Sequence, residues 1–130
     1  MVTPEAARSL ESAREVFITT FDADGAPGTV PMWFVLIDGR VYVTTGSDSR
    51  KAHKLRADPR ARLAVGSRDG PALAGTVSFA SDPAVFRRAS DALFAKYEGY
   101  WTDAERLVRG WERGRSVLLD VTPDPEPGEG

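Results

Sequence analysis

The chain has 130 residues, of which 42% are hydrophobic, enough for one globular domain with its own core. Its formal net charge of −2 gives no general attraction for nucleic acid. It has no cysteine and a single histidine, His53, which excludes disulfides, thiolate metal sites and thiol nucleophiles. No stretch reaches the ~20 apolar residues that cross a bilayer and no signal-peptide pattern opens the chain, so we expect a cytoplasmic protein with no membrane partner.

The first elements predicted in chain order are a short helix and three strands. Thr3 and Pro4 are typical of an N-cap and a first helical position, and they predict a helix to about Ala13. Asp38-Gly39 is a strong signal for a two-residue hairpin. The predicted strands are residues 16–21, 29–37 and 41–45.

The segment from Thr29 to Ile37 carries apolar residues on both of its faces, which indicates burial on both sides. In a small antiparallel sheet, one face would fill a barrel and the other would meet a partner subunit or a flat ligand. A helix of the same chain packed over the outer face is the alternative. Pro31 lacks an N–H and therefore belongs at a sheet edge or an opening. We expect a homodimer with a ligand at its seam.

The most informative stretch is TTGSDSRKAHKLRADP, residues 44–59, in which a strand and a turn lead into a short basic helix. Asp48 or Ser49 is the expected N-cap. Arg50 and Lys51 fall in the first turn, where the helix dipole disfavours cations by up to roughly 1 kcal/mol each. A bound anion reverses that preference, so the pattern predicts a phosphate site. Solvated charges at a frayed helix end are the alternative.

The remaining elements are two strands, two helices and a last strand. Asp82-Pro83 predicts an N-cap followed by proline at the first helical position, and Gly99 would close that helix. Thr102 and Glu105 have capping-box spacing and predict a further helix to about Gly110. The elements expected from the basic helix onward are residues 49–57, 61–66, 73–80, 83–98, 103–110 and 116–121.

Together these segments resemble the split β-barrel family of pyridoxamine-phosphate-oxidase-like flavin and deazaflavin oxidoreductases, and within it the branch that uses coenzyme F420. The resemblance covers roughly Val16 to Pro123. It rests on FITTFDADGAPGTVPMWFVLIDGRVYVTTGSDSRKAHKLRADPRARLAV, GTVSFASDP, LFAKYEGYW and VLLDVTP. It implies a mainly β (α+β) fold, a split β-barrel of about six mostly antiparallel strands with short peripheral helices. We expect a single domain over residues 1–122 and, from the Pro/Gly/Glu composition, a disordered tail over 123–130.

The resemblance also implies a cofactor site. In the family, the turn and helix after the third strand hold the ribityl phosphate, and the second strand lies along the ring system. The family builds this site across a dimer, which implies a homodimer here, with residues 111–115 completing the partner's site. The resemblance implies that the ring would be bound by Pro31, Met32 and Trp33, and the ribityl chain or ring edge by Thr44 and Thr45. The phosphate would be bound by Ser49, Arg50 and Lys51, with Ser47 and Lys54 as weaker candidates.

The activity implied is that of an F420-dependent oxidoreductase, which transfers a hydride between the reduced deazaflavin and a small electron-poor organic substrate. Because the cofactor carries the hard chemistry, this suits a chain with one histidine and no evident carboxylate pair; we assign no catalytic residue, proton donor or metal site. The Arg50-Lys51 pair departs from the deazaflavin branch and is familiar from oxidases that bind flavin mononucleotide (FMN). FMN is therefore the alternative cofactor, and a flavin- or haem-binding module without turnover is a further alternative.

Three other features have plainer interpretations. The basic segment from Arg50 to Arg62 contains no interleaved aromatic residues, which argues against nucleic acid as a partner. His53 is expected at the surface or near the phosphate rather than as a catalytic base. Tyr97, Tyr100 and Trp101 are expected to pack a helix onto the barrel, with the wall of a substrate pocket as the alternative.

Overall fold

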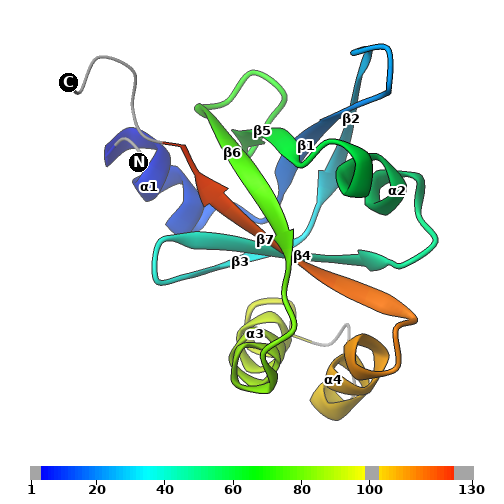
Figure 1. Cartoon of the computed structure of the whole chain (residues 1–130). Coiled ribbons are helices and arrows are strands. Elements are labelled where there is room, and N and C mark those ends of the chain that lie inside the picture. Colours follow the sequence, from blue (N-terminus) through cyan, green and yellow to red (C-terminus); the bar gives the residue numbers. More distant parts are fainter. Residues whose placement is uncertain (1–3, 99–102, 125–130) are drawn as a thin grey trace.

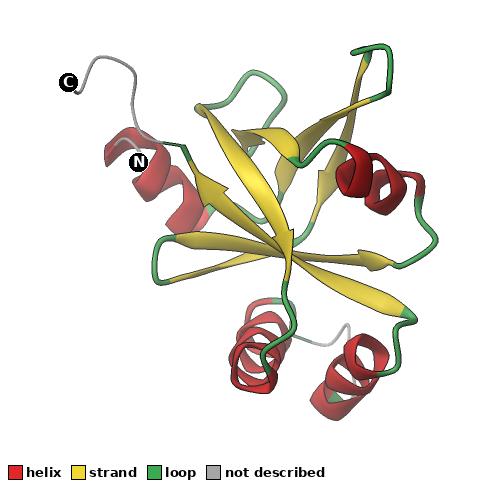
Figure 2. Cartoon of the chain, viewed as in Figure 1, coloured by secondary structure: helices red, strands yellow, loops and turns green. Residues whose placement is uncertain are grey.

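The computed structural model describes residues 4–98 and 103–124 (Figure 1). Within these residues, seven strands form one antiparallel sheet that curls into an open half-barrel with four helices around it (Figures 1 and 2). The expected mainly β fold is confirmed, with seven strands rather than about six. The strands are β1 (Val16–Phe21), β2 (Pro27–Met32), β3 (Phe34–Ile37), β4 (Arg40–Gly46), β5 (Arg60–Val65), β6 (Ala72–Phe79) and β7 (Ser116–Pro123), and the helices are α1 (Pro4–Ser12), α2 (Arg50–Ala57), α3 (Pro83–Lys96) and α4 (Ala104–Glu112).

The additional strand arises because the predicted strand 29–37 is wrong: it is two strands with a break at Trp33. The sheet order is β2-β1-β5-β6-β7-β4-β3, so β2 and β3 lie at opposite edges although they are neighbours in the chain. At the break, the Phe34 N–H donates a hydrogen bond to the Tyr97 hydroxyl at 2.9 Å. The prediction that Pro31 belongs at a sheet edge is confirmed, since β2 pairs only with β1.

Two hydrophobic cores lie on opposite faces of the sheet. The inner core fills the half-barrel and includes Leu10 of α1, Phe34 of β3 and Leu55 of α2. The outer core packs β3, β4 and β7 against α3 and α4, which lie below these strands in Figure 1, and it includes Val35. The burial predicted on both sides of the segment from Thr29 to Ile37 is therefore confirmed for β3, but it is wrong for the end of β2, where Val30 and Pro31 are exposed at the sheet edge. Two helices of the same chain, α3 and α4, cover the outer face of β3, as in the alternative given for this segment, in place of a partner subunit or a ligand.

Local signals for turns and caps held well. Asp38 and Gly39 have φ values of 52° and 78°, the positive pair that a type I′ hairpin turn requires. The Asp82 carboxylate accepts a hydrogen bond from the Ala84 N–H at 2.9 Å and caps α3. Helix α4 is capped by Asp103. The predicted closing and capping residues, Gly99 and Thr102, lie outside the described residues; α3 ends earlier than predicted, with Tyr97 at its C-cap, and the N-cap of α4 is one residue later than predicted.

The last strand and the chain end extend the domain slightly past its predicted limit. Strand β7 runs to Pro123, and the Asp124 N–H donates to the Ala74 carbonyl at 2.9 Å. Residues 125–130, where we expected a disordered tail, lie outside the described residues. In the part of the chain that the structure describes, no helix has the length and apolar character needed to span a membrane.

Candidate functional site

The predicted phosphate site corresponds to the N-terminus of α2. Ser49 is its N-cap: the backbone is extended, with φ −65° and ψ 151°, and Oγ accepts a hydrogen bond from the Ala52 N–H at 3.1 Å. Thr45 Oγ1 donates to the same Ser49 Oγ at 3.2 Å. The first turn contains no acidic residue, and Arg50 and Lys51 occupy positions where an acid would relieve the helix dipole. This helix end therefore concentrates positive charge.

A cavity of about 120 Å³ opens beside this helix end, between α2 and the β1–β2 hairpin. Gly28 leaves room in it, because a Cβ at this position would lie 2.9 Å from the Lys54 Nζ. Thr20 pairs with Gly28 across the β1–β2 ladder, and only 3% of its surface is exposed. We call this cavity the α2 pocket, and its lining residues are Thr20, Gly28, Val30, Arg50, Lys51 and Lys54.

Three cations meet in the α2 pocket. Burial lowers the pKa of Lys51, and the nearby Lys54 ammonium lowers it further. Lys54 pairs with Asp22 at 3.1 Å, whereas Arg50 and Lys51 form no ion pair with any described residue. A phosphate group bound here would accept charge-assisted hydrogen bonds from these two side chains and would favour the charged form of Lys51. The electrostatics of the pocket thus suit an anion.

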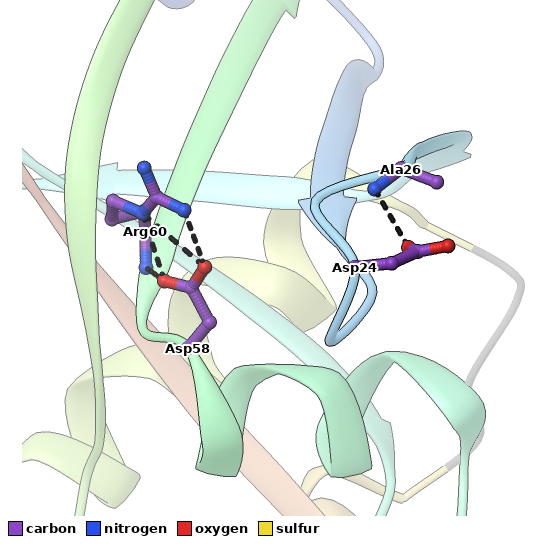
Figure 3. Close-up of polar contacts among 4 residues, drawn as sticks. All are labelled: Asp24, Ala26, Asp58 and Arg60. Atoms are coloured by element: carbon purple, nitrogen blue, oxygen red, sulfur yellow. Dashed lines mark hydrogen bonds and ion pairs between the residues drawn. The ribbon is translucent and has the colours of Figure 1, made fainter.

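Two turns fix the elements that flank the α2 pocket (Figure 3). In the β1–β2 turn, the Asp24 carboxylate accepts a hydrogen bond from the Ala26 N–H at 3.0 Å. At the far end of α2, the Asp58 carboxylate accepts hydrogen bonds from Arg60, at 2.7 Å from Nη2 and 3.1 Å from the backbone N–H. The side chain and then the backbone of Arg60 lower the pKa of Asp58 to about 2. Each turn is therefore held by local hydrogen bonds, and the Lys54–Asp22 ion pair joins the hairpin to the helix.

The predicted residues at the end of β4 separate onto two sides. Thr45 bonds the N-cap of α2, as described above. Thr44 Oγ1 instead accepts a hydrogen bond from Trp111 Nε1 at 2.9 Å. Ser47 donates to the Arg115 carbonyl from its N–H at 3.0 Å and from its Oγ at 3.1 Å. Thr44 and Ser47 thus contact residues 111–115 of their own chain, the segment that the family resemblance assigned to the partner's site.

The three residues predicted to lie along the ring are at the end of β2 and in the break after it. Pro31 is exposed at the sheet edge, and Met32 is half-buried against the inner core. Trp33 is half-buried and stacks on Tyr97, with 4.4 Å between ring centroids and 5° between ring planes. Because Val30 lines the α2 pocket, strand β2 connects that pocket to Trp33.

Three residues of the α2 pocket, Thr20, Gly28 and Val30, were not among the predicted site residues. They share one face of the β1–β2 ladder, where Thr20 lies opposite Gly28 and Ile18 lies opposite Val30. The sequence shows the β1–β2 turn and the alternation of each strand, which are the signals that bring these three residues to one face. Predicting that they line the pocket requires, in addition, the pairing register of the two strands and the position of α2.

Of the aromatic cluster, Tyr97 packs α3 onto the sheet as expected: it is 1% exposed, and its hydroxyl donates to the Arg14 carbonyl at 2.7 Å. Tyr100 and Trp101 lie outside the described residues. His53 is exposed on α2, as expected. Across residues 4–98 and 103–124, no group of three His, Cys, Asp or Glu side chains could hold a metal ion.

Comparisons with known proteins identify a family and a fold. Residues 2–124 match the family model of pyridoxamine 5′-phosphate oxidase, whereas no curated protein matches by sequence. A conserved hypothetical protein from Mycobacterium tuberculosis has 24% identity and a TM-score of 0.72, over 96% of this chain and 83% of that chain. An F420 reductase has 23% identity and a TM-score of 0.69, over 95% and 97%. The haem storage protein HutZ from Vibrio cholerae has 14% identity and a TM-score of 0.73, over 96% and 92%.

Proposed function

Because this chain belongs to the pyridoxamine 5′-phosphate oxidase family, we propose that it is an F420-dependent oxidoreductase whose α2 pocket holds the phosphate of the coenzyme. When bound, the deazaflavin would exchange a hydride with a small electron-poor organic substrate. The observation that carries the proposal is the meeting of Arg50, Lys51 and Lys54 at a helix N-terminus that has no acid in its first turn. The structural likeness to an F420 reductase supports the choice of cofactor.

The residues of the α2 pocket fit a phosphate group. Gly28 provides space, Thr20 provides a hydroxyl, and Arg50 and Lys51 provide cations that have no acidic partner among the described residues. From this pocket, the rest of the coenzyme would follow β2 past Val30 toward Trp33. The side chains would then position the coenzyme by charge at one end and by apolar contact at the other.

We also propose that the protein works as a homodimer with the cofactor at the subunit seam. The α2 pocket measures about 120 Å³, whereas sites for small molecules generally measure roughly 300–1,000 Å³. One chain therefore accommodates the phosphate but does not enclose the ring. Val30 is 39% exposed and Pro31 is exposed at the edge of β2, and a second copy over this edge would exclude water from the ring.

FMN is the second candidate cofactor. Its phosphate is a monoester with a charge of about −1.5 to −2 at neutral pH, which suits Arg50 and Lys51, the two cations of the pocket that have no acidic partner among the described residues. The cation cluster is therefore compatible with either cofactor, and the structural likeness to an F420 reductase is what favours F420. A flavin- or haem-binding module without turnover is a further alternative, in line with the structural likeness to HutZ.

The test is a fluorescence titration of the purified full chain with F420 and, in parallel, with FMN. We expect the wild type to bind F420 more tightly. Lys51→Ala is expected to weaken the binding of either cofactor at least about tenfold, because it removes a charge-assisted hydrogen bond. Arg62→Ala is the matched control: it removes a cation from the same basic segment, but from an exposed position of β5 that does not line the α2 pocket.

The outcomes separate the candidates. A preference for FMN would move the protein to the flavin branch of the family. Binding of neither cofactor would contradict the proposed enzyme and leave the fold unaffected. Equal affinities in Lys51→Ala and Arg62→Ala would contradict the assignment of the phosphate to the α2 pocket.

A further inference from the structure

A second and larger cavity lies between α4 and the start of β7, which meet at the lower right of Figure 1. Its volume is about 600 Å³. Apolar surface is contributed by Leu107 and Trp111, and none of the described residues that line it is acidic. We call it the arginine pocket, because its lining includes four arginines: Arg106, Arg109, Arg113 and Arg115.

Among the described residues, Arg109 is the one of these four arginines that forms a close ion pair with an acid, and the Asp103 carboxylate also interacts electrostatically with Arg106. Arg109 pairs with Asp103 at 3.0 Å, but the other three form no ion pair with any described residue. The C-terminal dipole of α4 favours cations in the last turn and at the C-cap, which accounts for Arg109 and Arg113. It does not account for Arg106, which lies in the first turn of α4, or for Arg115 beyond the helix. Like charges around one cavity repel one another, and a bound anion would relieve that repulsion.

The backbone that carries these arginines is fixed. The Arg115 N–H donates to the Gly110 carbonyl at 3.0 Å, and the Arg115 carbonyl accepts the two hydrogen bonds from Ser47 described above. Trp111 is only 6% exposed and forms a rigid floor. Binding an anion would therefore order the arginine side chains but not the loop beneath them, which keeps the entropic cost low.

We propose that the arginine pocket binds a small organic polyanion, a ligand with at least two phosphate or carboxylate groups. Guanidinium groups bind both kinds of group bidentately, so the chemistry on the protein side is the same for either. The volume lies within the roughly 300–1,000 Å³ typical of small-molecule sites and exceeds what one inorganic ion needs. The arginine pocket shares no lining residue with the α2 pocket, so a Lys51→Ala variant can distinguish binding here from binding of the cofactor phosphate in the α2 pocket.

The test uses the full chain, labelled with ¹⁵N, and follows the arginine Nε–Hε signals by NMR during titration with pyrophosphate and, separately, with citrate. We expect one or both probes to shift the signals of the arginine-pocket residues. Arg113→Ala combined with Arg115→Ala is expected to raise the Kd at least about tenfold, because two charge-assisted contacts are lost. The control, Arg62→Ala combined with Arg68→Ala, removes the same charge from exposed arginines of β5 and the following turn and is expected to change the Kd less than about twofold.

Each outcome bears on the proposal. A response to pyrophosphate alone would identify phosphate groups as the preferred anion, and a response to citrate alone would identify carboxylates. Unchanged signals from the arginine-pocket residues, or equal weakening in the two double variants, would overturn the proposal. Loss of the response in Lys51→Ala would also overturn it, because the probe would then occupy the α2 pocket. Arg106→Gln, on an exposed position of α4, provides a second variant if the double variant does not fold.

Discussion

The ammonium group of Lys96, at the end of α3, lies 3.4 Å from the centroid of the Phe34 ring and donates to the Phe34 carbonyl at 3.1 Å. Burial, and then the nearby Arg14 guanidinium, lower the pKa of Lys96 to about 8. Arg14 also lies over the Tyr97 ring, 4.9 Å from its centroid. Two cations and two aromatic rings therefore join α3 to the start of β3.

This environment predicts a specific pH dependence. Between pH 8 and 10.5 the unfolded chain keeps the Lys96 proton that the folded chain releases, so the free energy of unfolding rises with pH across this window. Lys96→Met keeps an apolar stem and removes the titration. We expect the stability of the variant relative to the wild type to fall as the pH is raised through the window. Urea denaturation of both proteins at several pH values measures this, and a pH-independent difference would contradict the shifted pKa.

Single residues of the α2 pocket differed in how far they could be predicted. The N-cap of α2 was predictable to within two neighbouring residues, Asp48 and Ser49, because a cap depends on local sequence, and the structure shows that it is Ser49. Thr44 and Thr45 follow one another in β4 and point to opposite faces, so Thr44 contacts Trp111 and Thr45 contacts Ser49, and their contact with a cofactor stays a prediction. Thr20 and Gly28 depend on the pairing of two strands, which no local motif contains.

At the scale of elements, the largest error was the single strand predicted over residues 29–37. No glycine, asparagine or aspartate punctuates the chain at Trp33, so local signals predict continuity. The break depends on Tyr97, whose hydroxyl contacts the backbone of Phe34 from 63 residues away. A contact of that separation belongs to the tertiary fold, which strand propensity does not encode.

The hairpin between β3 and β4 provides a test of turn chemistry. Gly39→Ala is expected to lower the free energy of unfolding by about 1 kcal/mol, because the φ of 78° is costly for a residue with a Cβ. Gly46→Ala, at the far end of β4, is the matched control: a Cβ there meets no atom within 4 Å, and the φ of Gly46 is not positive. Urea denaturation compares the two variants. Equal destabilisation would show that the turn conformation does not carry the effect.

At the scale of the whole molecule, the two cores leave the two sheet edges unequal. Helices α3 and α4 pack against the part of the sheet that contains β3, β4 and β7, and the opposite edge, β2, carries the exposed side chain of Val30. Sequence pattern predicted the two-sided burial of β3. The pattern did not show whether the outer face of β3 would be covered by a helix of the same chain or by a partner subunit, because either one would make the same apolar contacts.

The proposed homodimer is tested by sedimentation equilibrium. We expect a mass twice the chain mass of 14.1 kDa, and a tighter dimer when F420 or FMN is present, because a ligand bound at the seam stabilises the assembly. Val30→Glu introduces a charge at the proposed seam and is expected to favour monomers. Phe94→Glu, at a similarly exposed hydrophobic residue of α3, is the control. A wild-type mass of one chain in the presence of cofactor would contradict the homodimer.

The prolines of β2 have a consequence for aggregation. Unpaired edge strands are templates on which other chains can extend a sheet. Pro27 and Pro31 occupy alternate positions of β2, with Thr29 between them, and in an antiparallel ladder alternate residues direct their N–H groups to the same side. Proline has no N–H, and it is tolerated in an edge strand where the N–H would point away from the neighbouring strand. Among the N–H groups of Pro27, Thr29 and Pro31 that would point away from β1, only that of Thr29 therefore exists as a donor. This edge is therefore a poor nucleus for amyloid-like growth.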